Sequence, residues 1–161
     1  EKDYDARVIS LDMASGTIVA EHIIPRFVPS AIATNPSGDT VAVGLSNGRG
    51  VLLSAAKLDN PRELVGHKIQ LLSFAFSPDS TRLGTASGDR TFKLWDTEEG
   101  REILTIQDAA RMAAGNVPMP DWARFSPDAK QLVTAPSGVT TSALHAARQN
   151  LCVITSVLAP E

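Results

Sequence analysis

Residues 77–96, SPDSTRLGTASGDRTFKLWD, decide the fold, together with the pair Gly66-His67 just before them. Ser77-Pro78-Asp79-Ser80 has turn chemistry, because proline fixes φ and Asp or Ser can hydrogen-bond the nearby backbone. RLGTAS and TFKLWD have strand composition and are separated by the tight turn Ser87-Gly88-Asp89. SFAFS before them alternates phenylalanine with small residues, and REILTI follows the turn Glu98-Glu99-Gly100. The stretch therefore predicts four antiparallel strands joined by tight turns.

The same pattern occurs at three places in the chain: an apolar run, a proline in a polar turn, and a second apolar run. These are AIATNPSGDTVAVGLSNG (31–48), SFAFSPDSTRLGTASGD (73–89) and ARFSPDAKQLVTAPSG (123–138). Their prolines, Pro36, Pro78 and Pro127, are 42 and 49 residues apart. A period of about 40–45 residues is typical of four-stranded propeller blades. The repeat predicts an all-β protein.

TASGDRTFKLWD, together with Gly66-His67, resembles the WD-repeat β-propeller family. Other parts of the chain keep the register: Asp12 to Gly16 has the spacing of Asp96 to Gly100, and Asn47 stands where Asp89 stands. The resemblance implies about three and a half four-stranded blades of a propeller that has seven blades in most of the family.

The repeats divide the chain into parts of one partial propeller. We expect the end of one blade at 1–25, a second blade at 26–65, the best-formed WD blade at 66–106, an inserted loop or short helix at 107–121, and an eroded fourth blade at 122–161. Within the insertion, DAARMAA (108–114) is rich in helix formers, whereas SALHAARQN (142–150) is strand or helix. Closed propellers have about four to eight blades, so we expect a segment of a longer protein, or else a half-propeller that a second copy completes.

His67, Thr85 and Asp89 supply an imidazole, a hydroxyl and a carboxylate, the groups of a catalytic triad. A triad needs an exposed nucleophile and an oxyanion hole, whereas Thr85 is predicted in the middle of a strand between blades. The family resemblance implies instead that His67, Thr85, Asp89 and Trp95 form one buried hydrogen-bond network that holds the blade. We therefore expect no catalytic residue and no enzyme.

Composition excludes several other functions. The net charge of −3 is unfavourable for broad nucleic-acid binding. Cys152 is the single cysteine, and His22 and His145 have no partner at ligand spacing, so we expect no metal and no cofactor. The glycines of GLSNGRG (44–50) lack the Lys-Ser/Thr of a phosphate loop. No apolar stretch is long enough to cross a bilayer, and we expect an intracellular, cytoplasmic protein.

We expect the partners to be other proteins, in a multiprotein complex. The resemblance implies contacts at the narrow face, where the loops before each first strand and the turns between second and third strands emerge. The candidate residues are Arg26, Val28, Ser46, Lys68, Gln70, Gly88, Val117, Met119 and Ser137, with Met112 in the insertion. We expect a non-enzymatic protein–protein interaction scaffold. The alternatives are a regulatory or sensor propeller attached to a catalytic module elsewhere in a longer chain, and a nucleic-acid-associated protein with Lys68, Arg82, Arg90 and Lys93 as a basic patch.

Overall fold

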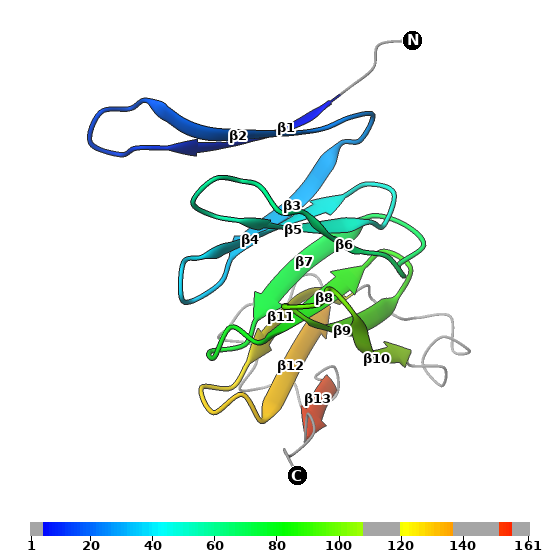
Figure 1. The fold of residues 1–161 in the computed structure, drawn as a ribbon. Helices are drawn as coiled ribbons and strands as arrows, with labels where there is room; N and C mark the ends of the chain where they lie inside the picture. Colours follow the sequence, from blue (N-terminus) through cyan, green and yellow to red (C-terminus); the bar gives the residue numbers. More distant parts are fainter. Residues whose placement is uncertain (1–4, 108–119, 137–151, 156–161) are drawn as a thin grey trace.

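The computed structural model describes residues 5–107, 120–136 and 152–155, which form strands and turns (Figure 1). The thirteen strands are β1 Ala6–Leu11, β2 Ile18–Ile24, β3 Pro29–Thr34, β4 Thr40–Leu45, β5 Gly50–Ser54, β6 Arg62–Leu64, β7 Leu71–Phe76, β8 Arg82–Ser87, β9 Thr91–Asp96, β10 Glu102–Gln107, β11 Pro120–Phe125, β12 Gln131–Pro136 and β13 Cys152–Thr155. They confirm the all-β prediction. The strands expected at RLGTAS and TFKLWD lie at those residues as β8 and β9.

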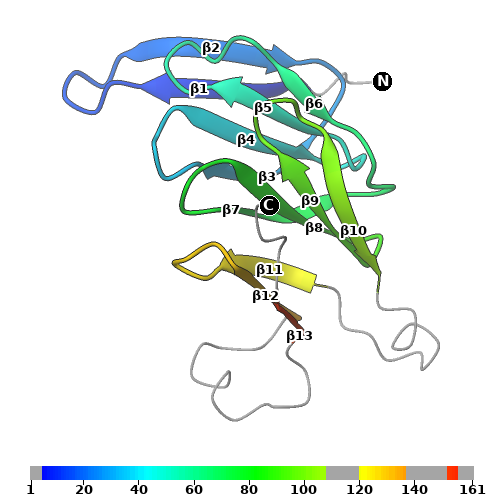
Figure 2. The same cartoon turned by 60° about the horizontal axis from the view of Figure 1, so that its bottom comes forward.

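The strands form a series of antiparallel meanders. Two sheets have four strands, in the orders β3-β4-β5-β6 and β7-β8-β9-β10, while β1 and β2 pair alone and β11-β12-β13 form the last sheet. The sheets lie face to face in succession, and β7 contacts both β3 and β11 (Figure 2). The first strands of successive sheets are therefore neighbours, as in the blades of a propeller.

The sequence repeat is also present in the backbone. The pairing of first and second strands shifts register at the same place in each later sheet, between Pro29 and Ala31, Leu71 and Ser73, and Pro120 and Trp122. Such bulges increase the local right-handed twist of a strand pair. The repeat thus sets the twist of each sheet as well as its strand order.

Period-two patterning places a core between each pair of neighbouring sheets. Val41, Val43 and Leu45 of β4 face the first sheet, while Ala42 of the same strand faces β8 and β9. The cores between the later sheets are built in the same way, from Leu52, Leu64, Leu83 and Trp95, and from Ala86, Phe92, Leu94, Ala123 and Leu132. Because both faces of the middle strands are buried, these strands are almost continuously apolar.

The third strand of the last sheet is β13, Cys152–Thr155, which pairs with β12. The segment CVIT has β-branched residues that suit a strand. The expected helix at 108–114 and the segment 142–150 lie outside the described residues.

Candidate interaction face and the network that supports it

A buried hydrogen-bond chain crosses the sheet β7–β10 on the side that faces β3–β6. The Asp89 carboxylate lies 3.1 Å from Nδ1 of His67, and Nε2 of His67 lies 2.7 Å from Oγ1 of Thr85. Trp95 donates from Nε1 to the same Thr85 oxygen, at 2.8 Å. His67 precedes β7, Thr85 lies on β8, Asp89 in the next turn and Trp95 on β9, so the chain connects a loop to two strands.

The hydrogen bonds indicate that the imidazole of His67 is neutral. Burial lowers the pKa of His67 below its ordinary value, and this effect exceeds the opposing effect of Asp89. With the proton on Nδ1, His67 donates to the Asp89 carboxylate and accepts the Thr85 hydroxyl proton at Nε2. Burial acts to raise the pKa of Asp89, but hydrogen bonds from Thr91 and from the backbone N–H of Lys68 outweigh it and lower the pKa to about 2.

The same geometry is incompatible with a triad. Thr85 is completely buried, and its oxygen already accepts from Trp95 while its proton points to His67. A nucleophile must meet its substrate at hydrogen-bonding distance, and no substrate reaches this hydroxyl in the folded sheet. The four side chains can hold the sheet together, and they cannot attack a substrate.

The narrow face, which we define as residues 25–28, 46–49, 65–70 and 88–90, is one continuous surface. Ser46 donates its backbone N–H to the carbonyl of Val28, and Gly88 donates to the carbonyl of Gln70. The loops 46–49 and 65–70 meet at Gly48, where a Cβ would lie 2.6 Å from the carbonyl oxygen of His67. The structure thus brings six candidate residues to one face: Arg26, Val28, Ser46, Lys68, Gln70 and Gly88. Met112, Val117, Met119 and Ser137 lie outside the described residues.

The basic patch of the nucleic-acid alternative does not form. Lys93 is buried and its Nζ donates to Glu102 at 2.8 Å and to Thr105 at 2.6 Å. Arg82 and Arg90 lie at opposite ends of β8, since Arg82 begins that strand and Arg90 follows its end. The hypothesis of a patch with these residues is wrong because strand direction separates them.

Sequence reasoning missed several residues of the narrow face. The Arg49 guanidinium lies over the Phe27 ring, 5.6 Å from its centroid, and pairs with Glu63. Ile69 is an exposed large apolar side chain next to Lys68. No sequence motif marks Arg49 or Ile69. However, Arg49 follows Asn47 at the spacing at which Thr91 follows Asp89, and this register could have placed Arg49 on the narrow face.

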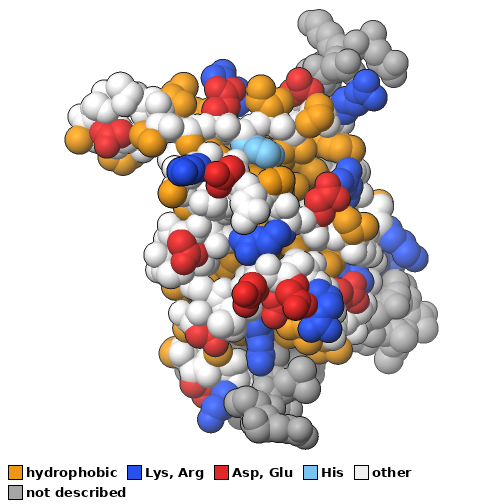
Figure 3. Space-filling view, viewed as in Figure 1, with side chains coloured by type: hydrophobic (Ala, Val, Ile, Leu, Met, Phe, Trp, Pro, Cys, Tyr) orange, Lys and Arg blue, Asp and Glu red, His pale blue; other side chains and the backbone are white. Residues whose placement is uncertain are grey.

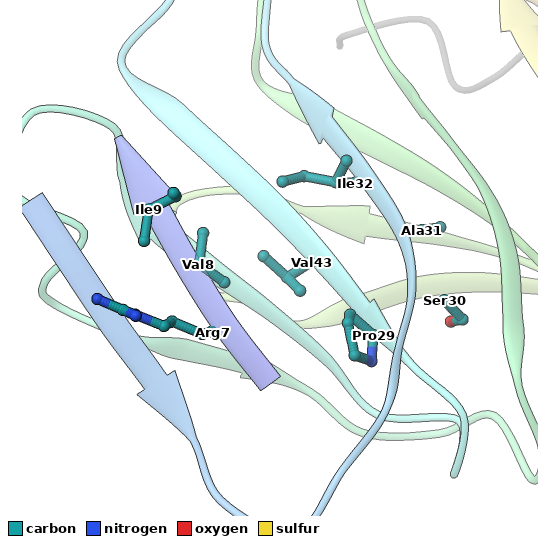
Figure 4. A pocket seen from close by; sticks show the side chains of 8 residues that line it. All are labelled: Arg7, Val8, Ile9, Pro29, Ser30, Ala31, Ile32 and Val43. Atoms are coloured by element: carbon teal, nitrogen blue, oxygen red, sulfur yellow. The ribbon is translucent and has the colours of Figure 1, made fainter. Parts of the chain in front are cut away.

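A second surface feature lies at the first sheet. A groove of about 410 Å³ separates β1 from β3 and β4, and Val8, Ile9, Ile32 and Val43 surround it (Figure 4). In the described part of the chain, β1 pairs with β2 on one side and with no strand on the other. The groove is therefore an apolar surface beside a free strand edge.

Two further features concern the described residues alone. Among them no three His, Cys, Asp or Glu side chains come together as metal ligands. The same residues include no helix long and apolar enough to cross a membrane.

Comparisons with known proteins agree with this geometry. Residues 59–96 match the family described as WD domain, G-beta repeat. An uncharacterized WD repeat-containing protein of Synechocystis is 26% identical over 137 residues, which are 83% of this chain and 36% of that protein. Transducin beta-like protein 2 of Mus musculus is 40% identical over 77 residues, which are 45% of this chain and 17% of that protein. The β-propeller domain of Cps50 (Swd1) from Myceliophteria thermophila matches with a TM-score of 0.56 at 20% identity, over 68% of this chain and 34% of that one.

Successive antiparallel meanders with neighbouring first strands define the class of β-propellers, and the likeness to the Cps50 domain shows the same fold. The matched repeat at 59–96 contains His67, Thr85, Asp89 and Trp95. Residues 59–96 match the WD repeat, and the described part of the chain has the fold of about three blades of a β-propeller.

Proposed function

We propose that this chain is part of a non-enzymatic scaffold that binds other proteins through its narrow face. The observation that carries the proposal is the joining of six candidate residues on one surface, five of them exposed, above a buried hydrogen-bond network. A surface that is ordered before it binds loses little conformational entropy on association. The absence of an accessible nucleophile at Thr85 supports a binding role.

The match of residues 59–96 to the WD repeat supports the same proposal, since such repeats build a rigid platform from which loops emerge. The fold alone does not fix the function, and the chain spans only 17% to 36% of the two relatives described above. The proposal includes an intracellular complex, because the single cysteine excludes the internal disulfides common in secreted domains.

The test is native mass spectrometry of the tagged full-length protein, purified from its source at moderate salt. We expect at least one protein subunit in stoichiometric amount, and we expect a double substitution at Val28 and Ile69 to aspartate to release it. Both side chains are exposed, so the variant should fold. A full-length protein without any protein subunit, or a complex that the double substitution leaves intact, would contradict the proposal.

A further inference from the structure

The charges of the described loops differ between the two ends of the sheets. The narrow face has four basic residues and one acidic residue: Arg26, Arg49, Lys68, Arg90 and Asp89. We define the wide face as the turns at the opposite end, residues 12–17, 35–39, 55–61, 77–81, 97–101 and 126–130. It has seven acidic residues, Asp12, Asp39, Asp59, Asp79, Glu98, Glu99 and Asp128, and three basic ones, Lys57, Arg101 and Lys130. In Figure 3 several basic side chains lie along the right margin, whereas the left margin has acidic side chains and a basic one near its lower end.

Three of the narrow-face cations are free to meet a partner. Arg49 is engaged by Glu63, and the one acid, Asp89, is engaged by His67, Thr91 and Lys68 within the blade. Arg26, Lys68 and Arg90 are exposed, and their side chains form no ion pair within the described part of the chain. The face is therefore locally positive although the whole chain has a charge of −3.

Apolar side chains lie among these cations. Val28 is 52% exposed and Ile69 is 49% exposed. Ile69 follows Lys68 directly, and its Cδ1 lies 3.1 Å from where a Cβ on Gly88 would be. The isoleucine thus lies against the turn that leads to Arg90. A large apolar group beside cations is a surface to which an apolar anchor with flanking carboxylates is complementary.

The blade holds this surface in place. The backbone N–H of Lys68 donates to Asp89 at 2.8 Å, and the Ser87 hydroxyl donates to the carbonyl of Ile69 at 2.9 Å. Arg90 donates its backbone N–H to the carbonyl of Ser87. Lys68, Ile69 and Arg90 are therefore positioned before any partner arrives.

We propose that the narrow face binds an acidic peptide segment of a partner protein, which places an apolar side chain against Val28 and Ile69 and carboxylates on Lys68 and Arg90. This inference rests on the proposed scaffold function and names the chemistry of its partner. A nucleic acid fits the observations less well, because few cations are free on the narrow face. Arg26 extends the positive surface on the side of Val28.

The experiment selects random linear peptides from a displayed library on the 161-residue protein, and then measures binding of the enriched peptides by fluorescence anisotropy. We expect enrichment of Asp and Glu around one large apolar residue. The double variant Lys68→Glu, Arg90→Glu should weaken binding about tenfold or more, because both attractive pairs become repulsive. A single-stranded oligonucleotide serves as the second probe and should bind more weakly than the acidic peptides.

The matched control is Lys57→Glu, Lys130→Glu, which changes the net charge equally but on the wide face. It should leave peptide binding within about twofold of the wild type, because exposed charges separated by more than a Debye length of about 10 Å are screened. Near-ultraviolet circular dichroism of both variants checks that the blade is intact. Neutral or basic peptides, no enrichment, equal losses in both double variants, or tighter oligonucleotide binding would each overturn the inference. A different result would contradict the scaffold proposal itself, namely that the purified full-length protein contains no other protein subunit.

Discussion

At the scale of single residues, one buried hydroxyl connects the polar groups of His67 and Trp95 in the best-formed blade. Thr85 accepts from Trp95 and donates to His67, which donates in turn to Asp89. An unpaired buried donor or acceptor has a larger effect on stability than one added hydrogen bond, because its lost hydration is not replaced. The network therefore stabilises the fold mainly by leaving no member without a partner.

Replacing Thr85 with valine should lower the free energy of unfolding by about 2–3 kcal/mol. The substitution preserves shape but leaves the Trp95 N–H and the His67 Nε2 without partners. Urea unfolding followed by tryptophan fluorescence measures the change. The matched control is Thr34→Val, on the exposed side of β3, which should stay within about 0.5 kcal/mol of the wild type. Equal effects of the two substitutions would show that the network contributes little.

The pKa shifts predict that acid destabilises the protein. The pKa values of His67 and Asp89 are both lower in the folded chain than their ordinary values, so the unfolded chain binds more protons and acid favours unfolding. Stability should be constant above pH 7, fall as the pH drops below about 6.5, and fall further from about pH 4 as unfolded Asp89 takes up its proton.

The measurement is the urea midpoint over this pH range, for the wild type and for Asp89→Asn. The variant should lose stability less steeply below about pH 4, because it has no carboxylate at this site. A wild type that becomes more stable between pH 7 and pH 5 would contradict the assignment of a neutral His67.

At the scale of strands and turns, the eroded blades keep the geometry of the well-formed one. Asp12 accepts the backbone N–H groups of Ala14 and Ser15, as Asp96 accepts those of Glu98 and Glu99. Gly16 and Gly100 both have a φ of 69°. Asn47 accepts from the N–H two residues later, as Asp89 does. The turn after β1 keeps its aspartate acceptor and its glycine, so it keeps its geometry although Leu11 stands where Trp95 stands in the well-formed blade.

Gly48→Ala should destabilise the protein more than Gly38→Ala. Both glycines have positive φ, 89° and 76°, so each alanine has a backbone cost of about 1–2 kcal/mol. At Gly38 nothing lies within 4 Å of the new Cβ, whereas at Gly48 the carbonyl oxygens of His67 and Ile69 lie 2.6 and 2.8 Å away. We expect about 3 kcal/mol or more for Gly48→Ala, measured by urea unfolding. Equal losses would mean that the two loops of the narrow face do not depend on this contact.

The sequence predicted the strands of residues 71–107 because proline turns and alternating apolar residues mark them locally. It predicted the partners of His67 only through the family resemblance, since 18 residues separate His67 from Thr85. It missed the burial of Lys93, because nothing local shows that Glu102 on the paired strand neutralises it. It did not predict β13 as the strand next to β12, because the pairing joins segments far apart in the chain. Local sequence patterns do not predict contacts between residues that are far apart in the chain.

At the scale of the whole molecule, the described blades leave apolar surface at one end of the series. Most of the exposed large apolar side chains lie between residues 9 and 32: Ile9, Leu11, Met13, Ile18, Val19, Ile23, Val28 and Ile32. The strand β7 contacts first strands on both sides, β3 and β11, whereas β3 has β7 on one side and the groove on the side of β1. The buried Oγ of Ser30 at this groove has no hydrogen-bond partner in the structure. Exposed apolar surface of this kind marks a site of interaction with another protein or another copy.

We therefore expect the 161-residue chain to associate with itself as its concentration rises, because an apolar groove beside a free strand edge favours pairing between copies. Sedimentation equilibrium should give a mass above the 17.1 kDa of one chain. Ile32→Lys, at a side chain 66% exposed, should bring the mass toward that of one chain without unfolding it. Val65→Lys, at a side chain 63% exposed and outside the groove, should leave association unchanged. If both variants associate as the wild type does, the copies meet elsewhere and the groove is not the surface that drives their pairing.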